Sequence, residues 1–285
     1  MNPLLFKIAW RLVVYPALAF AAISFVSLWV YVHPRRNVGD NKPENFGLKP
    51  EPLTLTTSDG VKLDAWFVPR EGSRKAVVIC HGYPMDKSDV LGLTSYLAKD
   101  FNLLYIDFRA MGRSGGMFST GGARETRDVD AAVSWLRDKG MESIGVYGFS
   151  MGAATTLLST NPAIKARVAD SPFANLREAL DDVFSPFGAF RKPLVGAMRL
   201  WGLLLTGSDI DDVSPEKSAA GITTPVLLIH GDADETVDHS SSERIKAANP
   251  AIELWIVKGA GHGETRYKAL SDYEKHVRGF FLKNL

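Results

Sequence analysis

Cysteine is nearly absent from this chain, which has a single copy, Cys80, among 285 residues. One thiol cannot form an internal disulfide, so bridges give no information on the compartment in which the protein works. The His and Cys spacings that bind metals are also missing, and the sequence predicts neither a metal nor a cofactor. Basic and acidic side chains balance to a net charge of +1, which gives no support to nucleic-acid binding.

Charge is missing altogether from residues 12–32, where the side chains are almost all apolar. This run is long enough to cross the hydrocarbon core of a bilayer as one helix. Trp10 and Trp29 lie near its ends, where amphipathic aromatic side chains prefer the interface. We therefore expect a single-pass membrane protein, with an uncleaved transmembrane anchor at 12–32 that follows a tail of residues 1–11.

Two aspects of this segment stay open. A cleaved signal peptide is the alternative to an anchor, because residues 17–19, Ala-Leu-Ala, could serve as its cleavage site. The membrane orientation is not determined, because basic residues flank the segment on both sides. Lys7 and Arg11 precede it, and Arg35 and Arg36 follow it.

From residue 51 onwards, short β-branched runs alternate with helical stretches, which is typical of a mostly parallel sheet with helices on both faces. The turn at residues 58–60 joins the first two strands without a helix, so that edge should be antiparallel. The eight expected strands cover residues 53–56, 62–68, 76–80, 103–107, 144–147, 167–169, 226–230 and 253–257. The expected helices cover residues 87–98, 125–139, 151–159, 241–248 and 269–282. One α/β domain is therefore expected over residues 51–285, joined to the anchor by a linker at 33–50 that holds the domain off the membrane.

The alternation breaks at about residues 172–215, a stretch too long and too rich in Phe and Leu for a plain surface loop. We expect a small helical cap over the active site here. Ordinary helical packing against the sheet is the alternative. An apolar cap favours acyl or other apolar substrates, and it could also touch a bilayer.

The five residues 148–152, Gly-Phe-Ser-Met-Gly, follow a β-branched run and precede a helical one. A serine at such a strand–turn–helix junction is exposed at the edge of the sheet, and glycines two positions away on either side avoid a clash. A second match to the pattern, around Ser114, is followed by a Gly/Ser/Thr stretch that predicts a loop, so no helix begins behind it. Ser150 is therefore the expected nucleophile.

A serine needs a base, and the base needs an orienting acid. His262 lies in a glycine-rich loop directly after a strand, which suits a loop that carries an imidazole over the sheet edge. His276, in a helical pattern, and His230, at a strand end, are expected to have packing or turn roles. His262 is the expected base.

Asp234 is the favoured acid, because it follows the strand at 226–230. Asp170 is a rival, since it ends an earlier strand from whose edge a triad acid can also be delivered. The neighbours of Asp234 are expected to be turn formers or solvated charges. These neighbours are Asp232, Glu235 and Asp238.

The developing oxyanion needs two backbone N–H donors. We expect one from Met151, which follows the nucleophile, and one from the loop at residues 81–84. Within that loop Tyr83 is the expected donor, because Pro84 has no N–H.

Together these motifs resemble the α/β-hydrolase superfamily, in the family's order and across roughly residues 50–285. They are His81-Gly82, Asp107-Phe108-Arg109 followed by Gly112 and Ser114, the turn around Ser150, His230-Gly231 followed by Asp234, and Gly261-His262. The nearest likeness is to membrane-tethered esterases, lysophospholipases and acyl-thioesterases. The resemblance implies the α/β-hydrolase fold and a triad of Ser150, His262 and Asp234. In such relatives the loop that carries Ser114 shapes the site.

The expected function is a serine hydrolase that cleaves esters or thioesters of apolar acyl groups through an acyl-enzyme. The expected partners are a small-molecule or lipid acyl substrate and the membrane, with no nucleic acid. A serine peptidase or amidase on the same scaffold and a non-catalytic membrane scaffold remain as alternatives. A dehalogenase is disfavoured, because that chemistry needs a carboxylate where Ser150 stands. Nothing in the sequence determines the acyl length, the leaving group or the oligomeric state.

Overall fold

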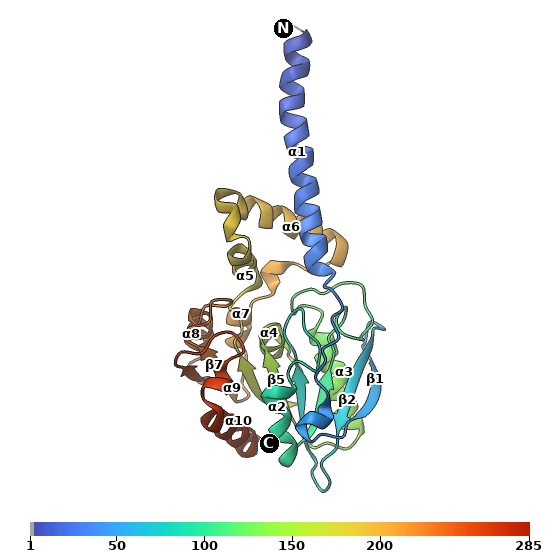
Figure 1. Cartoon of the computed structure of the whole chain (residues 1–285), viewed down its shortest axis with the longest axis vertical. Helices are drawn as coiled ribbons and strands as arrows, with labels where there is room; N and C mark the ends of the chain where they lie inside the picture. Colours follow the sequence, from blue (N-terminus) through green and yellow to red (C-terminus); the bar gives the residue numbers. More distant parts are fainter. Residues whose placement is uncertain (1–2) are drawn as a thin grey trace.

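A twisted sheet of eight strands forms the centre of the structure, a computed structural model that describes residues 3–285 (Figure 1). The strand order is β1-β2-β4-β3-β5-β6-β7-β8, with β1 and β2 antiparallel to their neighbours and the other strands parallel. The strands are β1 Glu51–Thr56, β2 Lys62–Val68, β3 Lys75–Cys80, β4 Asn102–Ile106, β5 Ser143–Phe149, β6 Ile164–Asp170, β7 Val226–Gly231 and β8 Glu253–Val257. This confirms the expected mostly parallel eight-stranded sheet with an antiparallel edge.

Helices cover both faces of this sheet, so its central strands are buried on two sides and are almost continuously apolar. On one face α10 packs Tyr273, Val277 and Phe281 against the sheet, and on the other α3 packs Val129 and Val133. The α-helices are α1 Pro3–Val32, α2 Leu91–Thr94, α3 Thr126–Asp138, α4 Met151–Leu158, α5 Leu176–Val183, α6 Arg191–Thr206, α7 Pro215–Ala219, α8 Ser240–Ala248, α9 Thr265–Lys268 and α10 Leu270–Asn284. Short 3-10 helices are η1 Pro43–Phe46, η2 Ser95–Lys99, η3 Ser185–Phe190 and η4 Ile210–Asp212.

Between β6 and β7 the chain forms α5, η3, α6, η4 and α7, and we call the first four of these helices the cap. Figure 1 shows the cap over the end of the sheet, with α1 beside α6 and projecting beyond it. Within α1, the stretch Trp10–Val32 is long and apolar enough to cross a membrane, with a mean hydropathy of 2.0. Of the expected tail at 1–11, residues 1 and 2 lie outside the described part of the chain.

Two stretches differ from their expected form. The expected helix at 87–98 begins only at Leu91, because Lys87 is buried in ion pairs with Asp64 and Asp107. The chain between α1 and β1 lies along the domain instead of extending away as a spacer. Gly39 donates its N–H to Asp86, and Leu48 is part of the hydrophobic core.

Candidate active site

Ser150 occupies the sharp turn between β5 and α4, with φ of 53° and ψ of −116°. This conformation is rare for a residue with a side chain, and the close packing around the turn maintains it. A Cβ at Gly148 would lie 2.2 Å from the carbonyl oxygen of Gly152. A Cβ at Gly152 would lie 2.5 Å from the carbonyl oxygens of Cys80 and His81. Both glycines are therefore required by the close approach of backbone to backbone.

Ser150, Asp234 and His262 follow strands β5, β7 and β8, whose carboxyl ends lie at one edge of the sheet. The Nε2 of His262 lies 3.0 Å from the Oγ of Ser150. Its Nδ1 lies 2.7 Å from a carboxylate oxygen of Asp234. The structure thus brings the three sequence-predicted residues into one hydrogen-bonded row, which has the order needed for a nucleophile, a base and an orienting acid.

The Asp234 carboxylate lies in a tight turn, and its side chain is 0% exposed. Burial alone would raise the pKa of Asp234, but hydrogen bonds from His230 and His262 and from the N–H of Val237 hold it well below its usual range. His230 contributes through its Nε2, 3.3 Å from the carboxylate, while its Nδ1 meets the hydroxyl of Ser242 at 2.7 Å. Asp234 is therefore ionised at neutral pH and can stabilise a protonated imidazole.

The loop at residues 81–84, which we call the oxyanion loop, lies directly against the serine. A Cβ at Gly82 would lie 3.2 Å from the Cβ of Ser150. Burial lowers the pKa of His81, so its ring is neutral and its Nε2 can accept the N–H of Phe108 at 3.0 Å. Its Nδ1 meets the carbonyl oxygen of Gly82 at 2.6 Å. His81 thus fixes the loop that carries Tyr83.

Met151 is the first residue of α4, so its N–H has no partner within the helix. The side-chain hydroxyl of Tyr83 is not a donor to the oxyanion, because it donates to the carbonyl oxygen of Tyr31 at 2.8 Å. Burial raises the pKa of Tyr83 to about 12, so the hydroxyl remains protonated and a donor. The backbone amides of Met151 and Tyr83 stay the predicted donors to an oxyanion.

Ser114, the second match to the serine pattern, is buried and has a structural role. Its hydroxyl donates to the carbonyl oxygen of Asp107 at 2.6 Å and accepts the N–H of Asp64 at 2.9 Å. These two hydrogen bonds link the loop after β4 to strand β2. The hydroxyl of Ser114 thus already acts as both a donor and an acceptor within the fold.

Asp170, the rival acid, is fully buried next to the site, where it accepts from Tyr273 at 2.8 Å and Thr265 at 2.9 Å. Burial raises its pKa, and these hydrogen bonds partly oppose that rise. It stabilises the start of α9 and its connection to α10. His276 is exposed on α10 and stacks on Trp255, in line with a surface role.

Sequence reasoning missed the buried cation Lys87, whose Nζ lies 2.7 Å from Asp107 and 2.5 Å from Asp64. Arg109 is a similar case, since its guanidinium joins Asp128 at 2.7 Å and Asp59 at 2.8 Å. The Asp107-Phe108-Arg109 motif indicated that charged residues lie after β4. It did not indicate their ion-pair partners, which are far away in the sequence. These four ion pairs stabilise the loop after β4, which contacts the oxyanion loop through the hydrogen bond from the N–H of Phe108 to His81.

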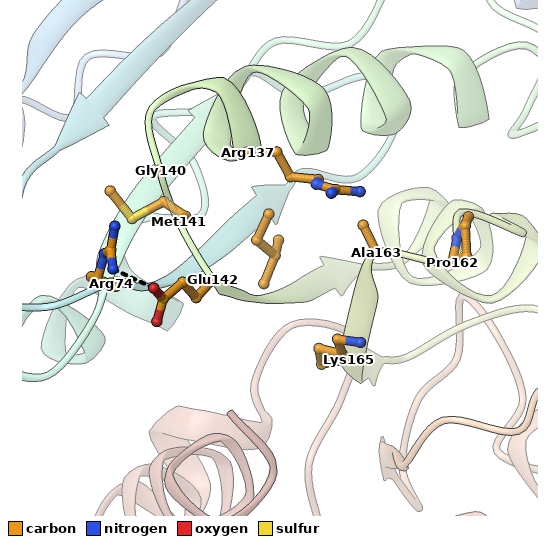
Figure 2. Close-up of a pocket in the computed structure, with 9 residues that line it drawn as sticks. Arg74, Arg137, Gly140, Met141, Glu142, Pro162, Ala163 and Lys165 are labelled. Carbon is orange, nitrogen blue, oxygen red and sulfur yellow. Dashed lines mark hydrogen bonds and ion pairs between the residues drawn. The ribbon is translucent and has the colours of Figure 1, made fainter.

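A separate hollow of about 490 Å³ lies at the opposite, amino-terminal edge of the sheet (Figure 2). Arg74, Arg137 and Lys165 line it together with Glu142, which pairs with Arg74. It has no serine nucleophile or histidine, so its lining offers no acyl-transfer chemistry. Within residues 3–285 no cluster of three or more His, Cys, Asp or Glu side chains is arranged to hold a metal ion.

Comparison with known proteins finds a matching family model and similar proteins in bacteria. A family model described as X-Pro dipeptidyl-peptidase (S15 family) matches residues 49–212. The uncharacterised Bacillus subtilis protein YqkD is 30% identical over 240 residues, which cover 80% of this chain and 78% of that protein.

Two solved structures illustrate the fold. The Pyrococcus furiosus esterase Pf2001 is 31% identical, with a TM-score of 0.72, and the alignment covers 89% of this chain and 98% of that chain. The Pyrococcus horikoshii acylaminoacyl peptidase has a TM-score of 0.62 over 84% of this chain and 42% of that chain. Its 20% identity makes that second likeness one of fold alone.

Proposed function

This chain belongs to the α/β-hydrolase superfamily and, within it, to the S15 family, so it is a hydrolase, and we propose that it cleaves carboxylic esters or thioesters of apolar acyl groups. The observation that carries the proposal is the continuous hydrogen-bonded row from Ser150 through His262 to Asp234, at 3.0 and 2.7 Å. In this proposal the two oxyanion donors are the amide of Met151, the first residue of α4, and the amide of Tyr83 in the oxyanion loop.

In this mechanism the Oγ of Ser150 attacks the acyl carbonyl while the Nε2 of His262 takes its proton. The amides of Met151 and Tyr83 stabilise the tetrahedral oxyanion. His262 then protonates the leaving alcohol or thiol, and the acyl group stays on Ser150. Water, activated by His262, releases the acid by the same route. Asp234 holds the ring with Nε2 toward the serine and stabilises the imidazolium.

The apolar character of the cap supports an acyl substrate. Its helices α5, η3 and α6 contribute Phe, Leu, Val and Met side chains, several of them exposed. An apolar element of this kind next to the site favours substrates with apolar acyl groups. The similarity to the Pyrococcus furiosus esterase is in line with an ester substrate.

A peptidase or amidase is the second candidate, because the matching family model is described by a dipeptidyl-peptidase. A peptide amine would need a carboxylate near the site. Glu178 in the cap is already paired with Arg244, but Asp181 has a buried carboxylate oxygen without a hydrogen-bond partner among the described residues. Comparing turnover of an X-Pro p-nitroanilide with that of p-nitrophenyl butyrate separates the two activities, and a preference for the anilide would favour the peptidase.

We also propose that α1 is an uncleaved membrane anchor. Only 11% of its apolar stretch is buried, whereas a core helix would be covered by other elements. Its last turns are packed against the rest of the protein, which a removable signal peptide does not need.

The first test is labelling of the detergent-solubilised full chain with a fluorescent fluorophosphonate. This probe modifies a serine that has a working base and oxyanion hole. We expect labelling of the wild type and of Ser114→Ala, and loss of labelling in Ser150→Ala. Loss in Ser114→Ala alone would contradict the assignment of the nucleophile. No labelling of folded wild-type protein would instead favour the non-catalytic scaffold.

A further inference from the structure

The cap has an apolar face that no other part of the described chain covers. It consists of Phe187 and Phe190 of η3 and of Leu200, Leu203 and Leu204 of α6. Phe190 is 71% exposed and Leu204 is 76% exposed. The three leucines are three and four positions apart, so they share one side of α6. Large apolar side chains gathered in this way mark a surface that meets an apolar partner.

The opposite side of α6 is packed against α1. The indole of Trp201 donates to the hydroxyl of Ser24 at 3.1 Å, and its ring meets Phe25 edge-on at 5.6 Å. Gly202 lies close to Leu28, and a Cβ added there would be 3.6 Å from that side chain. We call this contact the α1–cap seam. Its buried residues are Leu28, Val32, Phe184, Leu194, Val195 and Met198, with Phe20 and Tyr31 packed against them.

The length of α1 determines whether the part of the helix that packs on the cap lies inside the bilayer. A hydrocarbon core is about 30 Å thick, which needs about 20 helical residues. The part of α1 before Phe20, the first residue of the seam, rises only about 25 Å, and it includes Lys7 and Arg11. Its uncharged portion, residues 12–19, rises about 12 Å. The helix can therefore span a bilayer only if most of residues 20–32 are also inside it, and this stretch contains Ser24, Phe25 and Leu28, which contact α6.

We propose that the cap is embedded in one leaflet of the bilayer, with its exposed apolar face among the lipid acyl chains beside α1. We call this the proximal leaflet, the one on the side of the catalytic domain. Because α1 lies beside α6 (Figure 1), the lipid that surrounds α1 would also cover this apolar face. Arg35, three residues after the end of α1, and Lys192, near the start of α6, are exposed basic residues that can pair with anionic headgroups.

This placement connects the leaflet to the serine. The ring of Tyr31, in the last turn of α1, stacks on Tyr83 with centroids 6.5 Å apart and packs against Phe184 of the cap at 5.4 Å. Tyr83 belongs to the oxyanion loop, which touches Ser150 through Gly82. These contacts place the membrane end of α1 next to the oxyanion loop. Resting on the proposed function, we infer from this proximity that the substrates are acyl esters of membrane lipids that enter from the leaflet.

Depth measurement with the full chain in phosphatidylcholine–phosphatidylglycerol vesicles tests the placement. Cys80 is fully buried, so an introduced cysteine can be labelled alone with the fluorophore NBD. We expect labels at Phe190→Cys and Leu204→Cys to be quenched by acyl-chain doxyl lipids. A label at Glu71→Cys, before β3 and thus at the opposite edge of the sheet, should not be quenched.

Two outcomes would overturn the proposal. If the cap labels emit as in water and are not quenched, the cap lies outside the membrane. If they are shielded from water but are not quenched by doxyl lipids, the face is covered by protein, for example by a second copy of this chain.

A second arm tests the substrate class in the same vesicles. We compare hydrolysis of a vesicle-borne phospholipid with that of soluble p-nitrophenyl butyrate. In Leu200→Gln/Leu204→Gln the ratio of lipid to soluble turnover should fall at least tenfold, and in Leu282→Gln, an exposed leucine on α10, it should stay within twofold. An unchanged ratio in the double variant contradicts entry from the leaflet. Wild-type protein that hydrolyses neither ester refutes the proposed function, while the depth measurement still decides where the cap lies.

Discussion

At the scale of single residues, Ser150 has a backbone conformation that its neighbours impose. A positive φ at a serine costs of order 1–3 kcal/mol, and such strain is kept where the surrounding packing fixes it. Gly148 and Gly152 provide that packing, because the backbones of β3, β5 and α4 meet where their side chains would be. The nucleophile is thus presented by the fold before any substrate binds.

Gly152→Ala tests this packing. The added Cβ would lie 2.5 Å from two carbonyl oxygens, and overpacking of this kind usually costs about 1–3 kcal/mol. We expect the free energy of unfolding, measured with urea, to fall by that amount. The control is Gly279→Ala on α10, where nothing lies within 4 Å and where alanine should add about 0.5–1 kcal/mol. Equal effects of the two variants would argue against a steric role for Gly152.

His262→Ala tests the base. Without it the serine keeps its proton, so turnover of p-nitrophenyl butyrate should fall on the order of 10⁴- to 10⁶-fold. Circular dichroism should be unchanged, because the ring is partly exposed and its loss leaves no large cavity. His276→Ala is the matched control on the surface of α10 and should keep its activity within twofold. Normal turnover by folded His262→Ala protein would exclude His262 as the base.

At the scale of elements, local patterns predicted the sheet well. β2 and β8 have the expected bounds, and the other strands differ by one to three residues at an end, because buried parallel strands are apolar along their length. His262 was also predictable, since a glycine-rich loop after a strand is a local signal. Lys87 was not, because its burial depends on Asp64 and Asp107 from other strands.

The α1–cap seam was beyond local prediction for the same reason. The sequence indicates that α1 is apolar and that residues 172–215 are helical, but the contact between them joins segments about 170 residues apart. Gly202 has no special backbone angle that would mark it. Its role appears only when Leu28 is placed beside it.

Gly202→Leu tests the seam as a packing contact. A leucine there would push α6 away from Leu28, whereas Gly196→Leu on the same helix meets nothing within 4 Å. We expect a loss of about 1–3 kcal/mol for Gly202→Leu, seen as a lower thermal midpoint in detergent and faster proteolysis of the cap. Gly196→Leu should keep or slightly raise the thermal midpoint, because leucine is a better helix former than glycine, and should leave proteolysis of the cap unchanged. Similar midpoints for the two variants would mean that α1 and α6 do not pack in this way.

At the scale of the whole molecule, α1 is a structural part of the catalytic unit. Removing residues 1–33 would expose the seam residues Phe184, Leu194, Val195 and Met198. We expect the truncated protein to associate on size-exclusion chromatography without detergent and to bind an apolar dye more strongly than the full chain in detergent. A monodisperse truncated monomer with an unchanged thermal midpoint would show that the cap is stable without α1.

The junction after α1 has a kinetic consequence. The N–H of Ser119 donates to the carbonyl oxygen of Val32 at 2.8 Å, and Arg36 donates to the carbonyl oxygens of Ser114 and Gly116. These hydrogen bonds fix the orientation of the catalytic domain relative to α1, which a flexible linker would not do. With α1 in a bilayer, the protein would work in cis, on the membrane that holds it, and could not reach across to a neighbouring vesicle. Its rate would then follow the mole fraction of substrate in that membrane, a two-dimensional concentration, and would fall when inert lipid dilutes the surface.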